Sequence, residues 1–296
     1  MLYTTPPSTA YTSDEKHLAV ELDKLLTILQ VPHDKTLDDM IAASQKWRRK
    51  PGQERWELKD LSIDQKTHQQ AMDQLHRLDM MGEIKPQYQE YDYVLLLGAT
   101  IPRMRQRLEH LVRLWQQGIR FHRLVFLVGL RPLTRDVDQV EQLVIKAAGH
   151  KASPEAWPVN ELEGAEMLYR STSMPEAMSK VPVDYVDTRR RWAHNRWHRA
   201  NTRDTAITWF NKHPKPGKTL VISEQPSAHY QHEVVRQELP ERFIVDLAAM
   251  PAPSETRLVL ALDALALWLH NIRKQPDYWM VPPKAPSQIA LPPTRH

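Results

Sequence analysis

Cysteine is absent from this chain of 296 residues, and glycine and phenylalanine are scarce, with eight and four residues respectively. Without cysteine the chain can form no disulfide, and it offers neither a thiol nucleophile nor a thiolate metal ligand. The lack of disulfides also favours a reducing compartment, so we expect a cytoplasmic protein.

Long hydrophobic runs are missing as well. The longest apolar stretch, residues 258–269, contains Asp263 and is too short to cross a bilayer, so we expect a buried helix there. The N-terminus has no basic region followed by an apolar segment, which argues against a signal peptide. These absences predict a protein without a membrane span, although signal-independent secretion as an effector stays open.

The balance of residue types is that of an ordinary globular protein, with 41% hydrophobic residues, 26% charged residues and a net charge of +4. The length fits one large α/β domain with appendages as well as two domains. We expect a helical N-terminal cap or subdomain over residues 1–90, an α/β domain over residues 91–275 and a proline-rich tail over residues 276–296.

The first 90 residues carry helical patterns and no convincing strand pattern. Apolar residues such as Leu18, Leu22 and Leu25 recur at the helical period. The predicted helices span residues 13–29, 36–47 and 63–81.

From residue 91 onward, short apolar runs alternate with helical patterns. The predicted strands span residues 93–97, 123–128, 183–187, 219–223 and 242–246. The predicted helices span residues 104–117, 136–148, 161–169, 205–211, 229–239 and 255–274. Such alternation predicts a Rossmann-like α/β fold, with a mostly parallel sheet of about five strands flanked by helices.

The ends of the predicted strands are the expected ligand site, because ligands of open α/β sheets bind beyond the carboxyl ends of the strands. Gly98 and Gly129 directly follow the first two strands, where the backbone must turn and a ligand can approach closely. Asp187 ends the third strand, and Ser223 ends the fourth, with His229 shortly after it.

Arginines follow three of the first four predicted strands. Arg103, Arg105 and Arg131 lie close to the expected helix N-termini, and guanidinium groups in such places suit a phosphate or carboxylate ligand. The alternative is that these arginines are solvated or paired with nearby acids such as Asp136 and Asp138.

Residues 189–203 form the most unusual segment, with six arginines, two histidines and two tryptophans. Interleaved basic and aromatic residues can hold single-stranded nucleic acid through phosphate contacts and base stacking. They can also form a basic loop over the cleft. His194 and His198 would share one face of a helix, as paired zinc ligands do, but no third ligand is evident, so we predict no metal site.

Signatures of common cofactors are absent. The chain has no Walker phosphate loop, no three-glycine dinucleotide fingerprint and no nucleophile elbow. The cofactor therefore stays unknown, and NAD-dependent, P-loop and elbow-type hydrolase chemistry are not expected.

The order of these features resembles the SanA/ElyC/YdcF-like family of bacterial Rossmann-like proteins over about 150 residues. Leu95-Leu96-Leu97-Gly98, with Arg105 or Arg107, is similar to the first motif of that family, an apolar strand that ends in glycine and precedes an arginine-bearing helix. Val128-Gly129-Leu130 is similar to the second motif but lacks its serine and its second glycine. Gly164-Ala165-Glu166 resembles the third motif, and Asn201-Thr202-Arg203-Asp204-Thr205 resembles the fourth. Ser223, His229 or His232, and Arg236 resemble the last motif, but their spacing departs from the family's pattern.

The resemblance implies a small polar, phosphorylated or nucleotide-like ligand. It adds Asn201, Thr202, Asp204 and Arg236 to the expected ligand-binding residues, together with Ser223. Several members of that family are linked to the bacterial envelope, and many carry a membrane anchor that this chain lacks.

Three functions remain open. The first is an enzyme or ligand-binding protein for a small anionic molecule, with Glu166, Asp187 and His229 as candidate general acid/base groups. The second is a non-enzymatic interaction protein, such as a bacterial effector or adaptor, on a degenerate Rossmann-like scaffold. The third is nucleic-acid binding through residues 189–203.

Overall fold

The structure is a computed structural model, and it describes residues 13–50, 53, 55–148, 157–189, 191–193 and 196–273. The chain divides into two units. Residues 1–81 and 254–296 form unit 1, and residues 82–253 form unit 2.

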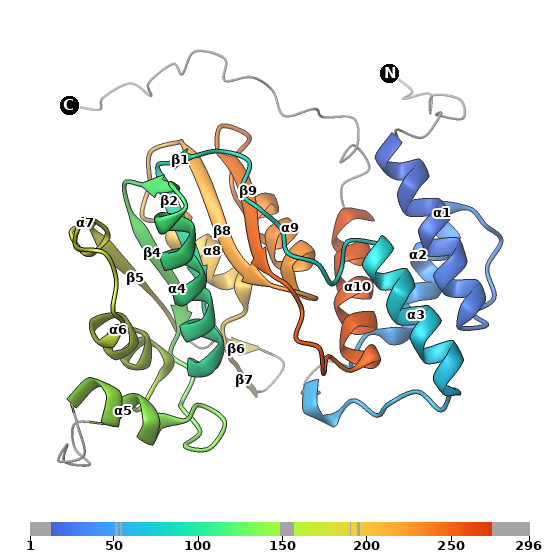
Figure 1. Cartoon of the computed structure of the whole chain (residues 1–296), viewed down its shortest axis with the longest axis horizontal. Helices are drawn as coiled ribbons and strands as arrows, with labels where there is room; N and C mark the ends of the chain where they lie inside the picture. Colours follow the sequence, from blue (N-terminus) through green and yellow to red (C-terminus); the bar gives the residue numbers. More distant parts are fainter. Residues whose placement is uncertain are drawn as a thin grey trace. The chain divides into compact units, whose positions relative to one another are not determined.

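Unit 2 contains a five-stranded sheet in which every neighbouring pair is parallel. The strand order is β5-β4-β2-β8-β9, as Figure 1 shows. The strands are β2 (Tyr93–Leu97), β4 (Leu124–Gly129), β5 (Val183–Thr188), β8 (Lys218–Glu224) and β9 (Ile244–Met250). The predicted α/β fold is confirmed, and each strand overlaps the segment predicted for it.

The central strands are buried along nearly their whole length. Every residue of β4 is buried, and in β2 only Tyr93 is partly exposed. Parallel sheets are covered by helices on both faces, so their strands are continuous apolar runs. This is why the runs Val94–Leu97 and Leu124–Val128 predicted strands reliably.

Helices cover both faces of the sheet with separate apolar cores. One core includes Met104, Leu108, Leu143 and Leu168, and the other includes Ala206, Trp209 and Val235. The first face therefore carries α4 (Ile101–Gln116), α5 (Val140–Ala148) and α6 (Glu161–Ser171). The second face carries α8 (Thr202–Phe210) and α9 (Ala228–Glu238). A short helix, α7 (Glu176–Ser179), precedes β5.

Four short strands complete the described part of unit 2. The parallel pair β1 (Glu90–Tyr91) and β3 (Arg120–Phe121) lies just before β2 and β4 in the chain. The antiparallel pair β6 (Arg191–Ala193) and β7 (Arg196–His198) follows β5. The helical spacing considered for His194 and His198 is therefore wrong, because Arg196–His198 is extended and paired, and His194 lies outside the described residues.

Unit 1 is helical, as expected for the N-terminal region. It contains α1 (Ser13–Ile28), α2 (Leu37–Ser44), α3 (Gln65–Arg77) and α10 (Leu258–Arg273), with short 3-10 turns at Gln45–Trp47 and Arg55–Glu57. Helix α10 is mostly buried and packs against α2 and α3. It therefore belongs to unit 1, whereas the sequence placed it at the end of the α/β domain. The predicted tail, residues 276–296, lies outside the described residues.

Candidate functional site

The strand order reverses between β2 and β8. The chain builds β2, β4 and β5 outward in one direction and then returns to place β8 on the other side of β2. Ligands of such sheets bind at the carboxyl ends of the two strands that flank this reversal. In unit 2 these ends carry Gly98, after β2, and Glu224, the last residue of β8.

Two arginines of α4 contact a single carboxylate at this point. Arg103 Nη1 lies 3.0 Å from Glu224 Oε1, and Arg107 Nη2 lies 3.6 Å from the same oxygen. The exposed fractions of the three side chains are 45% for Arg103, 2% for Arg107 and 10% for Glu224. We refer to Arg103, Arg107 and Glu224 as the switch-point cluster.

Arg107 is fixed by several groups of the protein interior. Its Nη1 donates to the carbonyl of Leu97 at 2.6 Å, and its Nη2 donates to Gln231 Oε1 at 3.3 Å. Ser223 Oγ also donates to Gln231 Oε1, at 2.5 Å, so this oxygen accepts from both sides. Ser223 is fully buried and therefore orients the Gln231 amide toward Arg107. Burial lowers the pKa of Arg107, and the Glu224 carboxylate opposes this change.

The switch-point cluster carries more positive than negative charge. Among the described residues, Glu224 is the one carboxylate within ion-pair distance of Arg103 and Arg107. The buried Nε of Arg107 and both carboxylate oxygens of Glu224 lack a hydrogen-bond partner there. Buried polar groups in folded proteins are almost always hydrogen-bonded, so the donor Arg107 Nε is a candidate for contact with an anion, whereas the Glu224 oxygens are acceptors and could contact only a donor.

A second charged cluster lies at the ends of β2 and β4, and we call Arg131, Asp138 and Glu161 the β4 cluster. Arg131 donates to Asp138 Oδ1 at 2.7 Å, to Asp138 Oδ2 at 2.9 Å and to Glu161 Oε2 at 3.1 Å. Asp138 is fully buried and also accepts from the backbone N–H groups of Ile101 and Thr134. The alternative of internal pairing is thus the arrangement seen for Arg131.

The β4 cluster has one guanidinium for two carboxylates. Burial raises the pKa of Asp138, but the Arg131 hydrogen bonds and the N–H of Thr134 outweigh it, and the net shift is downward. Burial also raises the pKa of Glu161, and here the attraction of Arg131 is too weak to reverse the shift. The carboxylate of Glu161 lies against Gly98, where an added Cβ would approach Oε1 to 2.1 Å. Gly98 thus makes room for Glu161.

The other residues expected to bind the ligand differ in whether they have internal partners. Asn201 and Asp204 form a capping box at the start of α8, in which each side chain accepts from the other residue's backbone N–H. Arg236 pairs with Glu233 one turn earlier in α9, at 2.8 Å. Thr202 is the first residue of α8. An added Cβ at Gly129 would meet the methyl group of Ala200 at 3.2 Å. Arg105 lies on α4, and its Nε and Nη2 are buried without a hydrogen-bond partner among the described residues.

The three candidate acid/base residues are not brought together. Glu166 lies in the middle of α6 and its nearest charged partner is Arg170, at 3.9 Å. Asp187 is exposed on the edge strand β5, whereas His229 lies in the first turn of α9, after β8. Strands β5 and β8 are three positions apart in the sheet, which corresponds to roughly 14 Å.

The basic segment is described only in part, since Arg190, His194 and Asn195 lie outside the described residues. Arg203, at its end, contacts Glu238 and donates to Gln237 at 2.8 Å, so this arginine ties α8 to α9. Within the described ranges, no group of three or more His, Asp or Glu side chains could hold a metal ion. No helix there is long and apolar enough to cross a membrane.

Sequence reasoning missed the partners of the arginines. The sequence names Arg107 only as an alternative to Arg105, and Glu224, Glu161 and Gln231 are not among the predicted ligand-binding residues. Two signals could have found some of them. Arg103 and Arg107 are four residues apart, which places them on one side of a helix, and Glu224 ends an apolar run where burial is expected.

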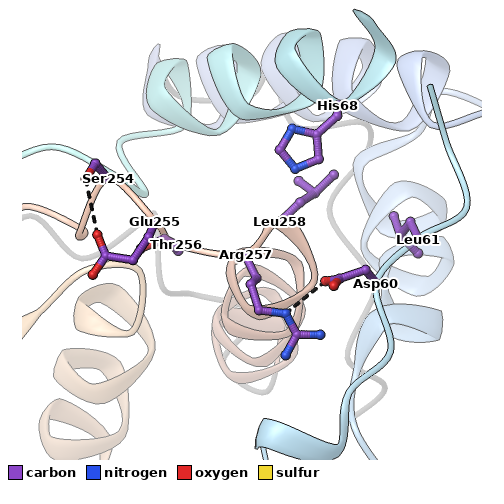
Figure 2. A pocket seen from close by; sticks show the side chains of 8 residues that line it. All are labelled: Asp60, Leu61, His68, Ser254, Glu255, Thr256, Arg257 and Leu258. Carbon is purple, nitrogen blue, oxygen red and sulfur yellow. Dashed lines mark hydrogen bonds and ion pairs between the residues drawn. The ribbon is translucent and has the colours of Figure 1, made fainter. Parts of the chain in front are cut away.

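Unit 1 has a pocket of its own, of about 310 Å³, which is shown in Figure 2. Arg257 extends to Asp60, with its Nε donating to Oδ1 at 2.9 Å, and Ser254 donates to Glu255 beside it. His68 lies over Leu258 on the other side of the pocket. Asp60 and Arg257 form an ion pair in this pocket, with one guanidinium for one carboxylate, whereas two guanidinium groups share Glu224 in the switch-point cluster.

Comparisons with known proteins gave no match. No family model, curated protein or solved structure matched this chain. The resemblance to the SanA/ElyC/YdcF-like family therefore stays a prediction.

Proposed function

We propose that unit 2 binds a small ligand with an anionic group, such as a phosphate or a carboxylate, at the switch-point cluster. The observation that carries this proposal is the shared carboxylate: Arg103 and Arg107 both contact Glu224, which leaves one positive charge in excess. The surplus guanidinium is that of Arg103, whose side chain is 45% exposed, so an anion can pair with it from the solvent side.

The positions of the two arginines support this proposal. Arg107 is held rigidly by Leu97 and Gln231, whereas Arg103 is nearly half exposed and can contact a molecule arriving from solvent. The ends of β2 and β8, from which the cluster projects, flank the reversal of strand order, the usual ligand position in this architecture.

A melting experiment with added ligands tests the proposal. Phosphate, ribose 5-phosphate and AMP are added to the wild-type protein and to Arg103→Ala, and the shift in Tm is recorded. We expect at least one of these compounds to raise the Tm of the wild type and to have much less effect on the variant. Arg123→Ala is the matched control, because Arg123, just before β4, forms an exposed ion pair with Asp184 of β5. Equal shifts in all three proteins, or no shift in any, would contradict the proposal.

The second candidate is a non-enzymatic interaction protein on this scaffold. Several residues expected to bind the ligand have partners inside the protein, which favours this candidate: Arg131 pairs with Asp138, Arg236 pairs with Glu233, and Asn201 and Asp204 cap each other. This candidate predicts that none of the three compounds shifts the Tm, and that Arg103→Ala changes stability slightly and nothing else.

A further inference from the structure

The surroundings of the switch-point cluster restrict how much negative charge a ligand can bring. We propose that the site selects a ligand with a single oxyanion group, one carboxylate or one phosphate, over a ligand with a chain of phosphates. This inference rests on the proposed function, since it concerns the same site.

The first argument is the number of charges. Two guanidinium groups share Glu224, so one added negative charge balances the described cluster, which is the charge of a carboxylate or of a singly ionised phosphate. A second phosphate would bring further negative charge close to the Glu224 carboxylate, whose side chain is only 10% exposed and cannot turn far into solvent. Like charges at such distances repel strongly when water is partly excluded.

The second argument is the N-terminus of α4, which in phosphate-binding folds supplies backbone N–H groups to the ligand. Here the N–H of Ile101 donates to Asp138 Oδ1 at 3.2 Å, and the next residue is Pro102, which has no N–H. The carboxylate of Asp138 thus already occupies the position of an anion at this helix. At this end of α4 the N–H of Ile101 is therefore already used and Pro102 supplies none, so a phosphate chain would find fewer backbone donors than a phosphate-binding helix usually offers.

The third argument is the neighbouring β4 cluster. It contains two carboxylates and one guanidinium, and the carboxylate of Glu161 lies against Gly98 at the end of β2. The carbonyl of Gly98 in turn lies 3.4 Å from Arg107 Nη1, so the two clusters meet at this residue. Beyond the first anionic group, a ligand therefore faces carboxylates on both sides, Glu224 from β8 and Glu161 from α6.

Anions of increasing length test this selectivity. Acetate, phosphate, pyrophosphate and tripolyphosphate are titrated into the wild-type protein at constant ionic strength without divalent cations, and Kd is measured by calorimetry. We expect acetate or phosphate to bind, which identifies the preferred group, and we expect no gain in affinity from phosphate to tripolyphosphate. A simple basic surface would instead bind more tightly with each added charge.

Replacing Glu224 sharpens the test. Glu224→Gln keeps the shape and removes the negative charge, so the affinity for tripolyphosphate relative to phosphate should rise about tenfold. Glu176→Gln is the control, because Glu176 forms an exposed pair with Lys180 on α7. A cooperative unfolding curve must first show that Glu224→Gln is folded. If this variant does not fold, the affinities of the wild-type protein for the four anions alone decide whether the selectivity holds.

The outcomes separate the two proposals. If none of the four anions binds, anion binding itself is wrong. If phosphate binds and tripolyphosphate binds the wild type more tightly, anion binding stands and the inferred selectivity is overturned. An unchanged ratio of affinities in a folded Glu224→Gln variant also overturns the selectivity.

Discussion

The switch-point cluster and the β4 cluster are built from the same residue types in opposite ratios. The first has two arginines and one glutamate, and the second has one arginine, one aspartate and one glutamate. In the β4 cluster, both oxygens of Asp138 accept hydrogen bonds from Arg131, and the backbone N–H groups of Ile101 and Thr134 donate to them as well. In the switch-point cluster, Glu224 Oε1 forms ion pairs with both arginines, but neither of the Glu224 oxygens nor Arg107 Nε has a hydrogen-bond partner among the described residues.

This difference separates a structural cluster from a candidate ligand site. A saturated buried network holds the fold together and has nothing left to offer a ligand. A buried network with unsatisfied atoms costs stability, and such costs concentrate at functional sites. Both clusters project from the same edge of the sheet, so the position at the strand ends cannot by itself identify the ligand site.

The largest expected effect comes from opening the β4 cluster. Arg131→Ala would leave the carboxylates of Asp138 and Glu161 buried without their shared partner, so we expect a loss of about 3 to 5 kcal/mol in the free energy of unfolding. Urea denaturation measures this loss. Arg123→Ala breaks an exposed pair and should cost less than about 1 kcal/mol. Similar losses in the two variants would mean that the β4 cluster is not a structural network.

The next largest effect is the loss of stability in acid, to which His110 on α4 contributes independently of both clusters. Burial lowers the pKa of His110 to about 4, below the ordinary value of 6.5, while Arg113 adds to this shift and Glu83 opposes it. The unfolded chain therefore binds a proton between these two pH values and the folded chain does not. The stabilising contribution is complete above pH 6.5 and is lost as the pH falls toward 4.

His110→Phe should remove this contribution. Between pH 6.5 and pH 4, the slope of unfolding free energy against pH should decrease by up to roughly 1.4 kcal/mol per pH unit. His110 Nε2 has no hydrogen-bond partner among the described residues, so the phenyl ring replaces no bond of that atom. Denaturation curves at several pH values measure the slope. A slope equal to that of the wild type would show that His110 is protonated in the folded state.

The two glycines at the strand ends provide a smaller contrast. Gly98→Ala would bring a Cβ to 2.1 Å from Glu161 Oε1 and to 2.8 Å from the carbonyl oxygen of Leu127, and backbone cannot move easily. We expect a loss of about 1 to 3 kcal/mol. Gly129→Ala meets its nearest atom, the Cβ of Ala200, at 3.2 Å and should cost less. Thermal unfolding of the two variants checks the order, and the reverse order would contradict the packing of Glu161 against Gly98.

The sequence predicted the fold better than the site, and the β2 and α4 region shows why. The run Tyr93–Leu97 is apolar because helices cover both faces of the sheet, so the cause of the strand is visible in consecutive residues. The partner of Arg103 and Arg107 is Glu224, more than a hundred residues later, and the partners of Arg131 include Glu161, thirty residues later. No local pattern encodes such pairs.

Gly98 also shows that local sequence does not reveal tertiary partners. Its place after a strand predicted close approach of a ligand, yet the group that approaches it is the carboxylate of Glu161 from α6. Sequence position indicates that space is needed beside a residue, whereas the group that fills the space is decided by tertiary packing.

The smallest effect concerns Asn201, which the family resemblance implied as a ligand-binding residue. Its side chain accepts from the Asp204 N–H at 3.1 Å and completes the capping box of α8. Asn201→Ala should therefore cost about 1 kcal/mol of stability, the usual value for a lost helix cap. The Tm shift produced by phosphate should be unchanged, in contrast to Arg103→Ala. Asn201→Ser keeps a capping oxygen and should restore most of the stability. If Asn201→Ala instead abolished the phosphate shift while the Tm of the free protein stayed the same, the ligand would reach α8, and the open site would extend beyond the switch-point cluster.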